Sequence, residues 1–142
     1  MTQEDRQIFL KDLCARTPYG VKVQYMNNIF VIDYVSPMYG EVKLDTSDNW
    51  TVGVSEVKPY LFPLSSITDE QKSELNKKFN VQFSGNDIYS IHHHSEGYWD
   101  TDLELDLQDW LWFINWCYKN HFDVNNLIEK GLALDVTGLN IY

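Results

Sequence analysis

A run of three histidines, His92 to His94, is the first candidate for a chemical role in this sequence. On a β-strand, His92 and His94 would share a face, because successive side chains alternate between the two faces. Two imidazoles placed in this way could hold a divalent metal ion, with a carboxylate such as Asp102 as the third ligand. An open fourth position would then permit metal-assisted hydrolysis. Turn-forming residues follow directly, so a solvated histidine run is the competing interpretation.

The acidic series after the histidines has the alternate spacing of a calcium-binding loop. It comprises Asp100, Asp102, Glu104 and Asp106. The series fails the full pattern, because Leu105 stands where the loop needs glycine and Leu111 where it needs a bidentate glutamate. An amphipathic lead-in to the next helix explains these carboxylates better. A divalent metal at His92, His94 and Asp102 is therefore the only cofactor that the sequence brings into consideration.

Nucleophilic catalysis has little support in the sequence. Cys117 and His121 are one helical turn apart, but Cys117 falls on an apolar face, where a thiol is inert. The chain contains no G-x-S-x-G elbow, no Walker loop and no Rossmann fingerprint. We therefore predict no catalytic residue outside the candidate metal site.

The most distinctive element is a tryptophan-rich stretch, Asp106 to His121, which the periodicity predicts to be a helix. At 100° per residue its apolar face takes Leu107, Trp110, Phe113, Ile114, Cys117 and Tyr118. Trp112 and Trp116 point the other way, among polar residues. Such a helix is either a central one, wrapped by the rest of the chain, or one that offers a surface to a partner.

A second apolar stretch, residues 58 to 67, is interrupted by Pro59 and Pro63 and is expected to be a loop over the core. It is either a structural lid or one wall of a groove, with Tyr60 and Phe62 in contact with a ligand or peptide. Together with Trp112 and Trp116, these two residues complete the predicted partner-binding set.

The remaining elements predict one α+β domain over residues 1–142. A helix over residues 3–15 is capped by Thr2, and a second helix begins at Thr68. Between them, short strands over residues 21–25, 29–35, 42–44 and 50–54 form an antiparallel meander. We expect this sheet of about four to six strands to pack against the N-terminal helix and the tryptophan-rich C-terminal helix.

Composition narrows the classes of partner. The net charge of −10 argues against nucleic acid and against an anionic membrane surface, and it suits solubility or a basic partner protein. Aromatic residues make up 15% of the chain, which favours a binding protein. The acidic N-terminus does not read as a signal peptide, and the two cysteines, Cys14 and Cys117, form no paired motif. We expect a cytoplasmic protein.

Three stretches, CARTPYGVKV from Cys14, VKPYLFPLSSITDEQK from Val57 and HFDVNNLIEKGLALD from His121, resemble a family of small uncharacterised proteins encoded by gut bacteria and their phages. The resemblance implies a phage-linked or mobile-element context, and it brings no activity or functional residue.

The leading hypothesis is a non-enzymatic, acidic protein-interaction module. The alternative is a metal-dependent hydrolase that uses His92 and His94 with a nearby carboxylate. Acidic mimicry of nucleic acid is a third possibility, and the oligomeric state is open.

Overall fold

The structure, a computed structural model, describes residues 1–78, 81–84, 87–93, 99–102 and 107–142, with the backbone alone given for the strands between residues 81 and 102. The helices are α1 (Gln3–Arg16), α2 (Asp69–Lys78) and α3 (Leu107–Lys119), and three 3-10 turns are η1 (Thr17–Tyr19), η2 (Val54–Glu56) and η3 (Leu64–Ser66). The strands are β1 (Lys22–Tyr25), β2 (Asn28–Ser36), β3 (Glu41–Leu44), β4 (Thr51–Gly53), β5 (Lys58–Leu61), β6 (Val81–Ser84), β7 (Asp87–His93), β8 (Trp99–Asp102) and β9 (Leu134–Asp135).

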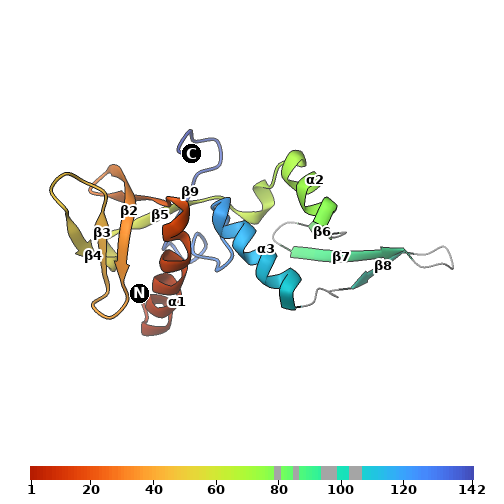
Figure 1. Cartoon of the computed structure of the whole chain (residues 1–142), viewed down its shortest axis with the longest axis horizontal. Coiled ribbons are helices and arrows are strands. Elements are labelled where there is room, and N and C mark those ends of the chain that lie inside the picture. The colour runs from red at the N-terminus through yellow and green to blue at the C-terminus, as the bar shows by residue number, and fades with distance from the viewer. Residues whose placement is uncertain (79–80, 85–86, 94–98, 103–106) are drawn as a thin grey trace.

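A six-stranded sheet has the order β4-β3-β2-β1-β5-β9, and β6, β7 and β8 form a second sheet (Figure 1). Among the described strands, all pairings are antiparallel except that of β5 with β9. The fold is α+β, with the predicted N-terminal and tryptophan-rich helices in place. Among the described helices, none is long and apolar enough to cross a membrane.

Helix α1 begins as its sequence predicts. The Thr2 hydroxyl accepts a hydrogen bond from the Asp5 backbone N–H, which satisfies one of the free donors of the first turn. Its apolar stripe, led by Phe9, Leu10 and Leu13, is buried against the six-stranded sheet. The helix and sheet thereby enclose the larger of two hydrophobic clusters.

The nearly continuous apolar sequence of residues 29–35 predicts a strand covered on both faces, but β2 is covered on one face only. Ile29 and Tyr34 are 50% and 57% exposed, whereas Ile32 and Val35 are buried. The register against β3 shifts between Ile32 and Tyr34, as at a β-bulge. The extra residue lets Ile32 and Val35, which are three positions apart, both face the core, and it leaves Asp33 and Tyr34 exposed. The prediction failed because apolar composition does not reveal a bulge.

Residues 58–61 are a strand, β5, and the expectation of a loop was wrong. Pro59 lies opposite Val23 of β1, while β9 pairs only from Tyr60 onward. At Pro59 the strand therefore has a partner on one side only, and the missing N–H of proline is tolerated at such a position. The loop prediction failed because the neighbours of a strand cannot be read from its sequence.

The second hydrophobic cluster surrounds α3. It comprises Ile67, Leu75, Phe113, Trp116, Cys117 and Phe122. Three members belong to α3 itself, and the others come from the residue after η3, from α2 and from the segment after α3. The tryptophan-rich helix is thus covered from more than one direction.

Candidate functional site

The tryptophan-rich helix uses its aromatic residues differently from the prediction. Trp116, expected on the polar side, is 5% exposed and stacks between Phe113 and Phe122. Leu107, expected on the apolar face, is 73% exposed. Helix α2 supplies Leu75 to the cover over this side of α3. Trp116 is therefore a core residue, because a second layer covers the face that a lone amphipathic helix would leave wet.

The other three partner-contact candidates differ in accessibility. Tyr60 is buried, and the half-buried Phe62 ring lies 6.0 Å from that of Phe122. Trp112 is half-buried and lines a pocket of about 230 Å³ together with Trp116. The Lys78 ammonium lies 5.6 Å from the centroid of the Trp112 ring. The structure thus brings the two tryptophans together, and Trp112 is the one with more surface to offer.

Among the predicted metal ligands, His94 lies outside the described residues. The register of the β7–β8 pair places His92 opposite Asp100 and Ser90 opposite Asp102. No group of three potential metal ligands occurs among the residues that the structure describes. The divalent metal site remains a prediction from sequence.

Cys117 and His121 pack against their neighbours in this structure and are poorly suited to nucleophilic catalysis. Burial raises the pKa of Cys117 to about 12, so the thiolate is scarce at neutral pH. Burial and the positive charges of Arg16 and Lys22 lower the pKa of His121 to about 4. The His121 ring stacks on Tyr142 with centroids 3.8 Å apart. A neutral thiol and a stacked, neutral imidazole make a poor nucleophile pair.

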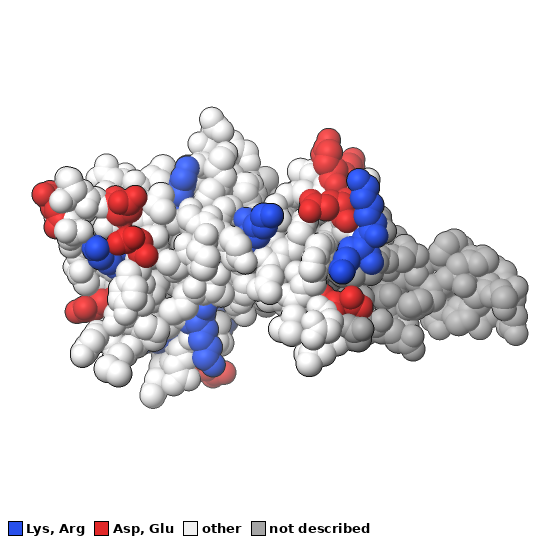
Figure 2. Space-filling model, viewed as in Figure 1, with Lys and Arg blue, Asp and Glu red and all other residues white. Residues whose placement is uncertain are grey.

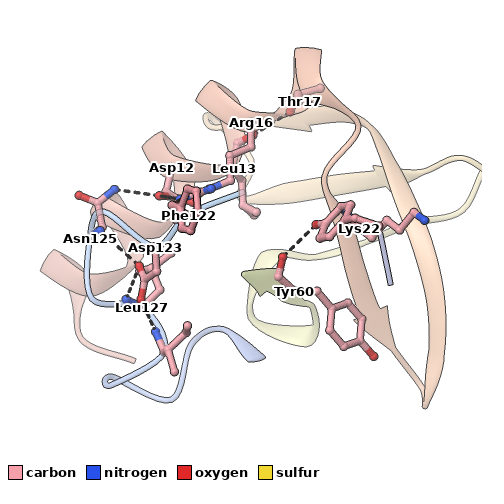
Figure 3. Close-up of polar contacts among 12 residues, drawn as sticks. Asp12, Leu13, Arg16, Thr17, Lys22, Tyr60, Phe122, Asp123, Asn125 and Leu127 are labelled. Atoms are coloured by element: carbon pink, nitrogen blue, oxygen red, sulfur yellow. Dashed lines mark hydrogen bonds and ion pairs between the residues drawn. The ribbon is translucent and has the colours of Figure 1, made fainter. Parts of the chain in front are cut away.

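A buried polar network, which sequence analysis missed, joins α1 to the segment after α3 (Figure 3). Asp12 and Arg16 are fully buried and paired with each other, and the Arg16 guanidinium donates to the Phe122 carbonyl at 2.7 Å. The Asn125 side-chain amide donates at 2.8 Å to Asp12 Oδ2, which also accepts from Arg16 Nη2 at 3.0 Å. The i, i+4 spacing of Asp12 and Arg16 could have predicted their ion pair from the sequence, but it could not have predicted the burial of that pair. The network is structural, because its members hydrogen-bond to one another inside the protein.

A solvent-facing surface of the sheet carries the strongest features of a binding site. Along β3, Val42 and Leu44 face the core, so the alternate residues Glu41 and Lys43 face the other way. The register places Tyr34 and Thr51 beside Lys43, on β2 and β4. We call this surface the outer face. It comprises Tyr34 and Ser36 on β2, Met38 and Tyr39 in the following turn, Glu41 and Lys43 on β3 and Thr51 on β4.

The outer face is hollowed and rich in exposed aromatic surface. Tyr34, Met38 and Tyr39 are 57%, 84% and 71% exposed. A hollow of about 280 Å³ is lined by Tyr34, Ser36, Tyr39, Glu41, Lys43 and Thr51. A larger one of about 490 Å³, which also reaches Met1 and Arg6, shares Tyr39, Glu41 and Thr51 with it. Sequence analysis missed this surface because the bulge at Asp33 and the turn before β3 create it.

Comparisons with protein-family models, with curated proteins and with solved structures found no match for this chain.

Proposed function

We propose that this protein is a non-enzymatic interaction module and that the outer face is where it binds another protein. The observation that carries the proposal is the exposed group of Tyr34, Met38 and Tyr39 beside a hollow. Tyrosine and methionine are enriched in protein interfaces relative to the rest of protein surfaces. Tyrosine supplies a large contact area with few rotatable bonds to immobilise, and antiparallel strands hold Tyr34 in place.

The edge of the sheet supports docking on the face rather than addition of a strand. Strand β4 is only three residues long. The Gly53 N–H donates to the Glu56 carboxylate at 2.7 Å, so that edge donor is already satisfied. Short edge strands with occupied donors discourage pairing with another chain. The partner therefore approaches the side chains of the outer face.

The proposal includes a cytoplasmic location and a phage or mobile-element context. Both cysteines are free, and Cys117 is buried, which suits a reducing compartment. The context rests on the three stretches that resemble small proteins of gut bacteria and their phages.

The test is site-specific photo-crosslinking in cells that naturally produce the protein. A photoreactive phenylalanine analogue at position 38 should form an adduct with another protein, whereas the same analogue at Leu139, also exposed, should not. Tyr39→Ser should weaken the adduct at position 38. Identical adducts from both positions, or adducts indifferent to Tyr39→Ser, would refute the outer face as the binding surface.

A further inference from the structure

We infer that the partner presents a cationic segment to the outer face, with a lysine or arginine side chain seated between Tyr34 and Tyr39 beside Glu41. This inference rests on the proposed function and adds the chemistry of the partner. It follows from the charge of the surface, from its unpaired carboxylate and from the rings around the hollow.

The part of the chain that forms the outer face is acidic. Residues 28–57 contain one lysine, Lys43, and five acids, so their formal charge is 1 − 5 = −4; the acids are Asp33, Glu41, Asp45, Asp48 and Glu56. All five are exposed. Figure 2 shows acidic side chains gathered at the end of the molecule where β2, β3 and β4 lie. Such a surface attracts positively charged partners and repels negatively charged ones.

The cations near the hollow leave Glu41 available. The Lys43 ammonium lies 3.0 Å from the Asp33 carboxylate, across the bulge in β2. Arg6 reaches over from α1, but its guanidinium packs against Gly40, where a Cβ atom would lie 2.0 Å from Nη2. Within the described part of the chain, the Glu41 carboxylate has neither a hydrogen bond nor an ion pair, while the Glu41 backbone pairs with β2 and β4. A cation from a partner would supply its missing counter-charge.

The rings of the hollow suit the same group. A guanidinium or ammonium ion is attracted to the face of an aromatic ring, and arginine stacks on such faces most often. Tyr34 and Tyr39 both line the hollow. The Ser36 and Thr51 hydroxyls, which line it too, can accept hydrogen bonds from the N–H groups of the bound cation. A lysine or arginine side chain is long enough to place its charge in the hollow while its backbone stays outside.

The experiment measures binding of a fluorescent oligoarginine peptide, with oligoglutamine of equal length as its neutral counterpart. Measurements at about 0.15 M salt screen long-range attraction. The arginine peptide should bind and the glutamine peptide should not. Tyr39→Ser and Glu41→Gln should each weaken binding about two- to fivefold, the size expected of an exposed cation–π or ion-pair contact. The matched controls Tyr19→Ser and Glu129→Gln, which alter exposed residues elsewhere, should leave it unchanged.

Two results would overturn the inference. Equal weakening by Glu41→Gln and Glu129→Gln would show general attraction to an acidic protein. Equal binding of the two peptides would show that the positive charge is not recognised. Neither result touches the proposed function, because the adduct at position 38 is measured separately. An adduct that forms at position 38 while the two peptides bind equally keeps the interaction module and removes the cationic partner.

Discussion

Asp12, Arg16 and Asp123 show how single buried polar residues organise this protein. Asp12 and Arg16 pair within α1, and Arg16 also holds the Phe122 carbonyl. Asp123 accepts hydrogen bonds from the backbone N–H groups of Leu127 and Ile128, at 2.9 Å each. Buried polar groups stabilise a fold only when they are partnered, and these contacts supply partners to all three side chains.

Removing one member of the buried ion pair should be costly. Arg16→Met leaves the Asp12 carboxylate buried without its charged partner, and we expect a loss of about 3–5 kcal/mol in the free energy of unfolding. Urea denaturation measures it. Lys130→Met, which breaks the exposed pair between Lys130 and Asp5, is the control and should cost far less. Similar losses for the two variants would contradict the structural role of the network.

His121 should make stability depend on pH. Its pKa is about 4 in the folded protein and near 6.5 when exposed, so the unfolded chain binds the proton more readily. The stability it contributes is complete above pH 6.5 and is lost as the pH falls toward 4. The urea midpoint should decline across this window, and less steeply in His121→Gln. Titration of the imidazole by NMR gives the pKa directly, and a value near 6.5 would contradict its burial.

At the scale of elements, the residues around α3 decide which of its side chains are buried. Its sequence places polar residues beside Trp112 and Trp116, yet only Trp112 keeps appreciable exposure. Trp116 stacks on Phe122, which lies beyond the end of the helix, with ring centroids 5.5 Å apart. Contacts with residues outside a helix therefore decide which of its sides is buried.

The two tryptophans should respond differently to truncation. Trp116→Ala removes a buried indole from the second hydrophobic cluster, and we expect it to cost about 3–5 kcal/mol in the free energy of unfolding. Trp112→Ala, one turn earlier, should cost clearly less because its side chain is partly solvated. Denaturant unfolding followed by circular dichroism compares them. Equal losses would mean that both indoles belong to the core.

At the scale of the whole molecule, residues distant in sequence close the fold. Strand β9 adds to the sheet beside β5 in parallel. Beyond it, the Tyr142 hydroxyl donates to the Tyr60 carbonyl at 2.9 Å and accepts from the Lys22 N–H at 3.1 Å. The Lys22 ammonium donates to the Ile141 carbonyl. The last residues of the chain are thus tied to β1 and β5.

Loss of this closure should be measurable. Tyr142→Phe keeps the ring and removes both hydrogen bonds of the hydroxyl, so we expect about 1 kcal/mol less free energy of unfolding. Amide hydrogen exchange should also quicken at Lys22. Tyr19→Phe is the control, since Tyr19 is exposed on η1. An unchanged exchange rate at Lys22 would show that the hydroxyl does not hold that amide.

Sequence reasoning reached much of the fold and little of the candidate site. The caps at Thr2 and Thr68 and the four strands of the meander were predicted, because each depends on residues near one another in the chain. The outer face was missed, because it depends on a bulge at Asp33 and on pairing with strands that follow.

Most of the local elements, the acidic charge and the supply of aromatic residues can be read from the sequence, since they follow from residue types and short-range spacing. The burial of Trp116, Asp12 and Arg16 and the position of Tyr34 and Tyr39 beside a hollow became known from the folded protein alone. The physical reason is that burial is fixed by which distant segments come together, and no single stretch of chain contains that information.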